Sequence, residues 1–372
     1  ILKDIPKIKR LFIKFPFYVV KIMLKIIRKV STFIRKLKKY FEMKKTAVVG
    51  FGFMGMTHAI NILKIKGLQL SAIIERDLSV IDRNLGSGMG NIATGSVSES
   101  SIANAGRYTD LDDCLKSEDL DAVIICTHVN THFELARKAL LNNKSVFIEK
   151  PFCLSLSEAA ELISIAGSAK KLLMVGHVVR FMAPYMQLKR WIESREFGEL
   201  KFLTFSRFCG LPGWGQWMEK NVRDLSGGAL FDLVIHDIDY AASVTGKPES
   251  INSTCLPGEY SNHDYVSALW KYKDKDLTVK IDGGFTYHKA YPFNAGFTAR
   301  FEKASVIYST LAGDVIRIAD NNSVREVPSG DAGAGYFNEM EYFAECLNRG
   351  EEPLLCSPQS SLEAIELCYK HI

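Results

Sequence analysis

Two short segments of this sequence hold side chains that can move a proton. In the segment 227–239, Asp232 and His236 are four residues apart, and Asp239 follows three residues later. Residues with these spacings share one face of an α-helix, so we expect all three side chains on one helical face. A carboxylate beside an imidazole favours the imidazolium and tunes its pKa toward the working pH of a general base.

Two other interpretations of the Asp232 and His236 pair remain open. A catalytic zinc ion would need a third protein ligand, and no Cys or His stands at a suitable spacing. We therefore expect no metal. The remaining alternative is a satisfied polar pair at a domain interface.

The second segment is Glu149-Lys150-Pro151, which follows the apolar run 145–148. Open α/β sheets bind ligands beyond the carboxyl ends of their strands, which is where this lysine would stand. Such a lysine can remove a hydroxyl proton if burial lowers its pKa, or it can polarise the oxygen. The alternative is a solvated lysine neutralised by Glu149.

A glycine-rich turn precedes both segments. Gly50-Phe51-Gly52-Phe53-Met54-Gly55 lies between an apolar run and a helical pattern, as in a dinucleotide-binding βαβ unit. The glycines permit a tight turn and close approach of the backbone to a pyrophosphate, while the helix N-terminus supplies amide donors. In this context the turn predicts a nucleotide site.

The choice of nucleotide depends on Glu75, which ends the next apolar run, 25 residues after Gly50. A carboxylate at this position can accept hydrogen bonds from both hydroxyls of the adenosine ribose, which favours NAD. The adjacent Arg76 can instead pair with a 2′-phosphate, so NADP is the alternative.

The elements that must position these residues follow an α/β pattern as far as about residue 175. Apolar runs of strand length alternate with helical periodicities, which predicts a parallel sheet covered on both faces. The predicted strands are 46–49, 68–74, 121–126, 145–148 and 172–175, and the predicted helices are 53–66, 131–141 and 155–169.

Longer strands follow one another after about residue 200, at 201–208, 264–272, 277–281 and 295–301, and two helical patterns close the chain after Asp331. This succession predicts an α+β domain with a mostly antiparallel sheet. We place a Rossmann domain at 43–172 and a substrate-binding and oligomerisation domain at 173–372, whose last helices can pack back on the first domain.

Charge is distributed unevenly along the 372 residues. Residues 1–42 hold 13 Lys and Arg against Asp4 and Glu42, a local charge of +11, which leaves −6 for the remainder because the chain carries +5. The acidic body makes nucleic-acid binding by the main domains improbable. From 19 to 41, apolar and basic residues alternate with helical period, which predicts a basic amphipathic helix.

Two interpretations of that helix are open. It can lie on an anionic membrane surface as a peripheral contact, or it can be a segment outside the enzyme proper, because Met43-Lys44-Lys45 resembles a natural start. No run of roughly 18 uncharged apolar residues and no signal-peptide cleavage pattern occurs. Eight scattered cysteines without a C-x-x-C pair favour reduced thiols and a cytoplasmic location, with the inner membrane surface as the alternative.

The segments above, taken in order, resemble the glucose-fructose oxidoreductase / inositol dehydrogenase (Gfo/Idh/MocA) family. The resemblance covers about residues 45–372. It is carried by Gly50-x-Gly52-x-x-Gly55-x-x-His58, residues 127–132, Glu149-Lys150-Pro151, Gly176-His177-Val178-Val179-Arg180-Phe181, and Gly228-x-x-x-Asp232-x-x-x-His236-x-x-Asp239. The sequence departs from the family at His128, where proline is usual.

The resemblance implies a Rossmann domain followed by an open sheet that supports a dimer or tetramer. It implies that Lys150, Asp232 and His236 are catalytic, with His236 the acid/base. The implied cofactor contacts include Thr127, His132 and Glu149. The implied substrate contacts are Asp239, together with His177 and Arg180, whose Gly-His-x-x-Arg-Phe segment is similar to that of nucleotide-sugar dehydrogenases, and we add Trp214 from the loop 208–223.

We therefore expect an NAD(P)-dependent oxidoreductase that moves a hydride between the nicotinamide and a secondary alcohol of a sugar, nucleotide sugar or cyclitol. A non-catalytic dinucleotide-binding sensor is one alternative, since a fold does not by itself imply a function. A membrane-surface protein that acts on envelope sugars is the other.

Overall fold

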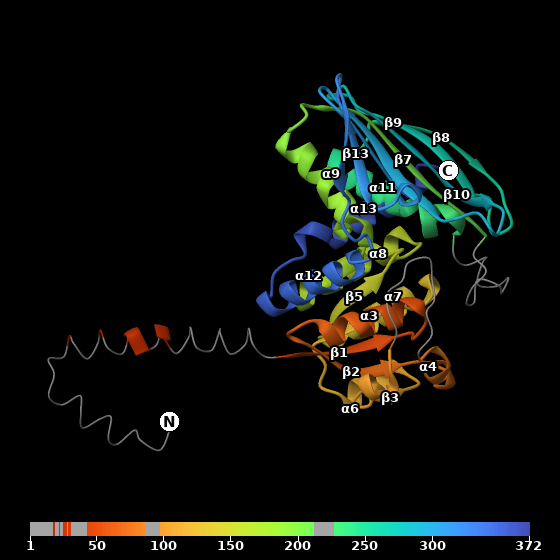
Figure 1. Cartoon of the computed structure of the whole chain (residues 1–372). Coiled ribbons are helices and arrows are strands. Elements are labelled where there is room, and N and C mark those ends of the chain that lie inside the picture. Colours follow the sequence, from red (N-terminus) through yellow and green to blue (C-terminus); the bar gives the residue numbers. More distant parts are fainter. Residues whose placement is uncertain are drawn as a thin grey trace, which may run out of the picture. The chain divides into compact units, whose positions relative to one another are not determined.

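The structure is a computed structural model that describes Tyr18, Ile22, residues 25–27, 29–30, 43–85, 97–211 and 227–372. The chain divides into two compact units, Ile1–Met43 and Lys44–Ile372. The second unit contains both predicted sheets (Figure 1).

The first sheet is parallel and has six strands in the order β3-β2-β1-β4-β5-β6. Its strands are β1 (Lys44–Val49), β2 (Leu68–Ile74), β3 (Gly106–Tyr108), β4 (Ala122–Ile125), β5 (Ser145–Glu149) and β6 (Leu173–Gly176). This arrangement confirms the predicted Rossmann sheet. Because β6 is its edge strand, the first sheet continues past the boundary that we expected after residue 172.

Alternate residues of these strands enter two separate cores, as a sheet covered on both faces requires. Val48 and Ile124 pack with α3, while Val49 and Ile125 pack with helices on the other face. The connecting helices are α3 (Phe53–Lys64), α4 (Ser79–Asn84), α5 (Glu99–Ile102), α6 (Leu111–Ser117), the 3₁₀ turn η2 (Val129–Thr131), α7 (His132–Leu141) and α8 (Leu156–Ala169).

The second sheet has eight strands in the order β14-β13-β12-β11-β7-β10-β9-β8. All neighbouring strands are antiparallel except β7 and β10, which run parallel, so the predicted mostly antiparallel sheet is confirmed. The strands are β7 (Leu200–Gly210), β8 (Ser250–Leu256), β9 (Tyr265–Lys271), β10 (Thr278–Tyr287), β11 (Asn294–Phe301), β12 (Ser305–Ser309), β13 (Val315–Ala319) and β14 (Val324–Pro328).

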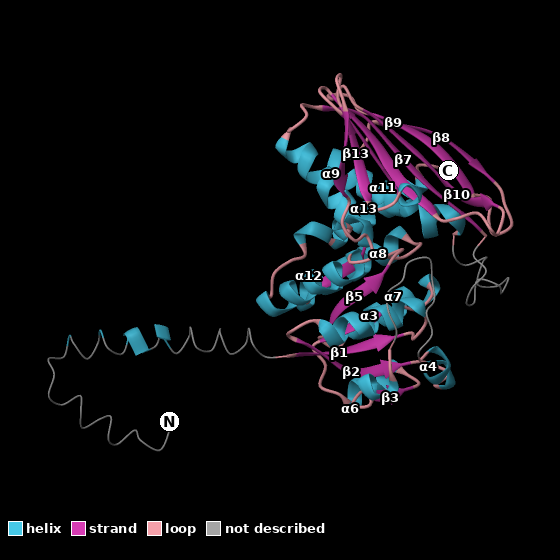
Figure 2. Cartoon of the chain, viewed as in Figure 1, coloured by secondary structure: helices cyan, strands magenta, loops and turns pink. Residues whose placement is uncertain are grey.

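Helices cover one face of this second sheet, as Figure 2 shows. Its largest core joins buried side chains of the central strands to these helices, with Trp270 of β9 fully buried among them. The helical elements of this part are η3 (Val178–Phe181), α9 (Ala183–Ser194), the π-helical turn η5 (Leu230–Val234), α11 (Ile235–Thr245), η6 (Thr310–Ala312) and α13 (Pro358–Tyr369).

The helix α12 (Gly335–Arg349) returns from the second sheet to the first domain. It packs against α3 and the turn η3, and its Met340 and Phe343 belong to the core of the Rossmann sheet (Figure 1). The turn η7 (Leu354–Cys356) follows α12, and its Cys356 thiol donates a hydrogen bond to the carbonyl of Val175 in β6. The two domains therefore share a core on one side of the first sheet.

The amphipathic helix expected at residues 19–41 falls within the first unit, and most of these positions lie outside the described residues. The few described positions are helical, and among them Ile22, Ile26 and Ile27 are exposed. Within the described residues, no helix is both long and apolar enough to cross a membrane.

Candidate active site

The glycine-rich turn leaves the beginning of α3 open to a phosphate group. A Cβ atom on Gly55 would lie 1.9 Å from the Gly50 carbonyl oxygen, so only glycine lets the helix start against the turn. Within the described part of the chain, a Cβ on Gly52 would meet nothing within 4 Å and no side chain caps α3. Its first turn, where Phe53 and Met54 stand, holds no carboxylate. Free amides and an uncompensated helix dipole at this position suit a pyrophosphate.

Glu75 lies directly behind this turn, as the ribose-binding hypothesis requires. Its Oε2 accepts a hydrogen bond from the Phe51 amide at 2.9 Å, and Asn84 Nδ2 donates to the Phe51 carbonyl at 2.8 Å. The phenyl ring of Phe51 is buried in the core, so only its peptide groups face the turn. Arg76 is exposed, and the fixed carboxylate of Glu75 is the charged group next to the cradle.

The loop after β4 is held by hydrogen bonds that are buried or partly buried. The hydroxyl of Thr131 donates to Thr127 Oγ1 at 2.7 Å, and the Thr131 amide donates to the His128 carbonyl, so the turn closes although His128 replaces proline. The His132 ring is buried, with Nε2 3.0 Å from the Thr127 carbonyl and Nδ1 2.9 Å from the Pro151 carbonyl. His132 thus connects this loop to the end of β5, while its ring atoms are occupied by backbone.

Lys150 reaches from the end of β5 to the second domain. Its Nζ donates to Asp232 Oδ1 at 2.9 Å and to the Asp232 carbonyl at 2.6 Å, although the two residues are 82 positions apart. Lys150 and Asp232 keep 16% and 29% of their side-chain surface exposed. An ammonium has three N–H donors, so these contacts leave one for another partner.

The element that carries Asp232 differs from the regular helix that we predicted. Residues 230–234 form a π-helical turn and α11 begins at Ile235, which changes the angular offset between Asp232 and His236. Isolated π-helical turns are frequent at functional sites. As a result Asp232 bonds Lys150, while His236 Nδ1 has no hydrogen-bond partner among the described residues.

The expected effect of Asp232 on His236 is therefore wrong. Burial lowers the pKa of His236 well below its ordinary value, and the charges of Lys150 and Arg207 lower it further. A neutral imidazole in a half-buried position can accept a proton, and within the described part of the chain the charges that act on it are positive.

Arg207 is a residue of this region that the sequence analysis missed. Its guanidinium lies in the core, donates to both carboxylate oxygens of Asp237 at 2.9 and 2.7 Å, and contacts the Tyr185 hydroxyl. The signal was present in β7, where Arg207 occupies an inward position in register with Leu203 and Phe205. The guanidinium of this buried pair lies near enough to His236 to lower its pKa.

Arg180 and Asp239 contact each other instead of a ligand. Arg180 donates to both oxygens of Asp239, at 2.7 and 2.6 Å, and also to the Leu355 carbonyl. Asp239 is fully buried. The two side chains therefore form a buried ion pair, and their contact with substrate stays a prediction.

His177 lies beside that pair, with Nδ1 3.4 Å from Asp239 Oδ1, and neither ring nitrogen has a hydrogen-bond partner among the described residues. Burial lowers its pKa to about 4. His177 is therefore a buried, neutral ring beside the Arg180–Asp239 pair. Trp214, the other predicted substrate contact, lies outside the described residues.

The start of the helical segment that carries Asp232 is held by a second residue that the sequence analysis missed, Asp264. Its carboxylate accepts hydrogen bonds from the amides of Tyr260 and Ser261, and Oδ1 lies 3.4 Å from the Ala229 amide. A Cβ on Gly228 (φ +69°) would lie 1.8 Å from Ser261 Oγ, so glycine is required at this approach.

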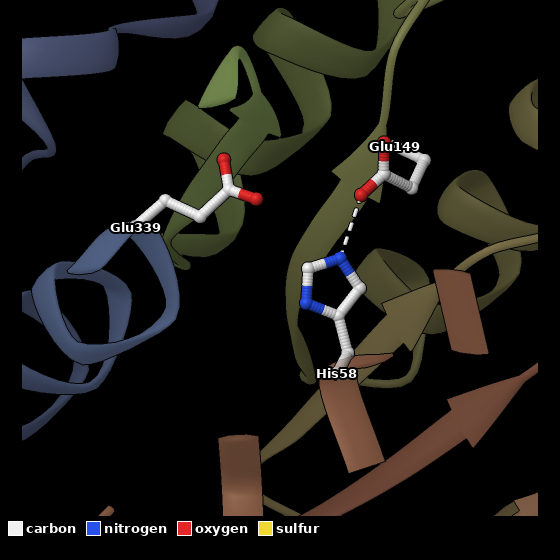
Figure 3. A group of neighbouring side chains, drawn as sticks. All are labelled: His58, Glu149 and Glu339. Atoms are coloured by element: carbon white, nitrogen blue, oxygen red, sulfur yellow. Dashed lines mark hydrogen bonds and ion pairs between the residues drawn. The ribbon is translucent and has the colours of Figure 1, made fainter. Parts of the chain in front are cut away.

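Glu149 lies below the cofactor turn in a buried cluster. It accepts a hydrogen bond from His58 Nε2 at 2.6 Å and from the Lys150 amide at 3.2 Å, and Glu339 of α12 lies nearby (Figure 3). His58 and Glu339 were not among the predicted site residues. Glu339 occupies the apolar stripe of its helix with Tyr336, Met340 and Phe343, which marks an unusual carboxylate in the sequence.

Comparisons with known proteins agree with this architecture. The family model "Oxidoreductase family, NAD-binding Rossmann fold" matches residues 44–177, a range that ends after β6, and the model "GFO/IDH/MocA C-terminal domain" matches residues 185–307. An open glycine cradle on a six-stranded Rossmann sheet, joined to this second domain, defines an NAD-dependent oxidoreductase. The chain belongs to the Gfo/Idh/MocA family.

The individual relatives share less than a third of their aligned residues with this chain. The scyllo-inositol 2-dehydrogenase (NAD(+)) of Bacillus subtilis (strain 168) is 29% identical over 255 residues, which cover 65% of this chain and 71% of that protein. The structure of UDP-N-acetylglucosamine 3-dehydrogenase from Acidithiobacillus ferrooxidans matches with a TM-score of 0.70 and 20% identity over 88% of this chain and 96% of that one. A levoglucosan dehydrogenase complex with NADH and levoglucosan matches with a TM-score of 0.74 and 16% identity over 88% and 96%. At these identities the structural matches show the fold.

Proposed function

We propose that this protein oxidises or reduces a ring secondary alcohol of a sugar, nucleotide sugar or cyclitol, with Lys150, Asp232 and His236 as its catalytic residues. The observation that carries the proposal is the contact between Lys150 at the end of β5 and Asp232 of the second domain. It places a partly accessible ammonium, with one N–H to spare, at the sheet edge where a Rossmann fold binds the reactive end of its cofactor.

The residues of the cradle fit NAD. The amides at the start of α3 and the Gly52 backbone would hold the pyrophosphate, and Glu75 would hold the adenosine ribose through the oxygen that Phe51 does not occupy. NAD supplies the hydride acceptor when it is bound. A 2′-phosphate would bring negative charge to the Glu75 carboxylate, which disfavours NADP.

The roles of the protein side chains follow from their charge. Lys150 donates its remaining N–H to the substrate oxygen and stabilises negative charge on that oxygen as the proton leaves. Burial and the neighbouring cations lower the pKa of His236, so its imidazole is neutral and has a nitrogen lone pair that can receive the proton. Asp232 orients the ammonium and balances its charge.

The relatives named above support the substrate class. They are named for a cyclitol, a nucleotide sugar and levoglucosan, which are all polyhydroxylated rings. The described residues do not distinguish between these three substrate types, because the predicted pocket residue Trp214 is not among them.

The proposal is tested by a panel of cyclitols, sugars, sugar acids and nucleotide sugars. Each compound is first screened by thermal shift with NAD present, since a ligand at about 100 times its Kd stabilises a protein by roughly 2.7 kcal/mol. Hits are then assayed for turnover through the absorbance of reduced nicotinamide. Turnover that is lost in His236→Ala, with NAD affinity retained, supports the proposal. NAD binding without turnover on any compound contradicts it and favours a sensor.

A further inference from the structure

The carboxyl group of Glu339 is buried without a partner. Its residue is 0% exposed, and neither Oε1 nor Oε2 has a hydrogen-bond partner among the described residues. It shares a pocket of the core with His58 and Glu149, and one ligand atom from each of the three residues lies within 4.8 Å of the others. Figure 3 shows the Glu339 carboxyl pointing from α12 toward the other two side chains.

The other carboxylate of this cluster is fully engaged. Glu149 Oε1 lies 2.6 Å from His58 Nε2, and Oε2 accepts from the Lys150 amide. Three elements meet at this point, because His58 comes from the helix that begins at the glycine turn, Glu149 ends β5, and Glu339 comes from α12. The cluster thus joins the cofactor cradle to the residue before Lys150.

Two ionised carboxylates in a dry core repel each other, and the site must hold either a proton or a cation to relieve that cost. The geometry favours the proton. Two ligand atoms at about 2.1 Å from one tetrahedral metal ion are separated by about 3.4 Å. The 2.6 Å between His58 Nε2 and Glu149 Oε1 is a hydrogen-bond distance instead.

We propose that Glu339 is a neutral carboxylic acid in the folded protein, and that the one proton it holds makes it a positioning residue for Lys150. An ionised Glu339 would repel Glu149 and displace it from His58 and from the Lys150 amide. A neutral Glu339 lets Glu149 keep both contacts. These contacts hold the backbone amide of Lys150 in place and so position its side chain. The effect on Lys150 rests on the proposed function, whereas the protonation of Glu339 does not.

Among the described residues, the basic side chains of this region have other partners, since His58 Nε2 lies on Glu149 Oε1. Lys150 donates to Asp232, and the guanidinium of Arg180 is occupied by Asp239. Burial raises the pKa of Glu339 well above its ordinary value, and the charge of Glu149 raises it further. The titratable groups next to Glu339 are His58 from α3, Glu149 at the end of β5, Cys126 after β4, Cys356 from η7, and Tyr336 from α12 itself.

The first test compares stability against pH for the full chain, Glu339→Gln and Glu341→Gln. The folded state holds a proton that the unfolded state releases above the ordinary glutamate pKa, so this group makes the wild type less stable as pH rises toward the folded pKa. The unfolding equilibrium constant of the wild type should rise by up to about tenfold per pH unit relative to Glu339→Gln. Glu341→Gln, at an exposed position of the same helix, should keep the wild-type dependence. Parallel curves for wild type and Glu339→Gln overturn the proposal.

A second measurement needs no variant. Infrared spectroscopy of the wild-type protein at pH 8 should show the C=O stretch of a protonated carboxylic acid, and the absence of that band overturns the proposal. Metal analysis of the purified protein should find no bound divalent ion. If the wild type instead binds one divalent ion per chain and Glu339→Gln loses it, the cluster is a metal site and the proposed neutral Glu339 is overturned.

Kinetics test the positioning role. Glu339→Ala should lower kcat/KM through a displaced Lys150, and Glu339→Gln, which keeps the size and neutrality of the acid, should restore most of the loss. If the wild type shows the infrared band but Glu339→Ala has wild-type kcat/KM, Glu339 is a protonated acid that does not position Lys150. That result overturns the positioning role.

Discussion

The Lys150–Asp232 pair and the Arg180–Asp239 pair are both ion pairs close to the end of the first sheet, and they differ in what they leave unused. Arg180 occupies both oxygens of Asp239, and these side chains are only 9% and 1% exposed. Lys150 uses one oxygen of Asp232 and keeps one donor, with both side chains partly accessible. A substrate can be handled only where hydrogen-bonding capacity and access remain, so the Lys150–Asp232 pair is the stronger candidate for chemistry and the buried Arg180–Asp239 pair is the weaker one.

The largest expected effect separates the two pairs by activity. Lys150→Met keeps the length of the side chain and removes its charge and donors, so kcat/KM should fall about 10²- to 10⁴-fold. Lys144→Met is the matched control, because Lys144 stands just before β5 at the other end of the strand and donates to the Leu120 carbonyl. Lys144→Met should keep kcat/KM near the wild-type value. An equal loss of kcat/KM in both variants would contradict a specific catalytic role of Lys150.

The next effect is on stability and falls on the buried pair. Asp239→Asn leaves the Arg180 guanidinium buried without a counter-charge, which should cost about 3–5 kcal/mol of the free energy of unfolding. Glu326→Gln breaks the exposed pair with Arg317 and should cost about 0–1 kcal/mol. Denaturant unfolding measures both. A cost for Asp239→Asn as small as that for Glu326→Gln would mean that the pair is solvated.

The smallest effect concerns pH and the histidine beside the buried pair. The pKa of His177 is lowered to about 4, so the unfolded state binds a proton below the ordinary histidine pKa while the folded state does not. The stabilising contribution is therefore present above about pH 6.5 and is lost as pH falls toward 4, with a slope of up to about 1 kcal/mol per pH unit. His177→Gln should remove this slope. An unchanged slope in the variant would contradict the assignment.

Local patterns in the sequence predicted the cofactor half of the site well. The glycine turn, the helix that starts at Phe53 and the strand that ends before Glu75 all depend on neighbouring residues, and the structure confirms each of them. The family resemblance grouped Lys150 with Asp232 as catalytic residues, and in the structure the Lys150 ammonium donates to the Asp232 carboxylate.

The substrate half depends on features that short patterns do not encode. The π-helical turn at residues 230–234 has no signature in hydrophobic periodicity. It changes the angle between Asp232 and His236 on the helix, so the expected interaction between the two side chains does not form. The pairing of Arg180 with Asp239 is a long-range choice that helical spacing cannot specify. Glu339 was different, because its place on an apolar stripe was visible in the sequence and only its partners were not.

A double-mutant cycle between Lys150→Met and Asp232→Asn, read out as kcat/KM on the best substrate of the panel with NAD affinity as the control, tests the central claim most directly. If the two side chains act as one catalytic pair, the double variant should lose little more activity than Lys150→Met alone, because effects of groups that act together are not additive. Losses that simply add, or a Lys150→Met variant with wild-type kcat/KM, would contradict the proposed active site.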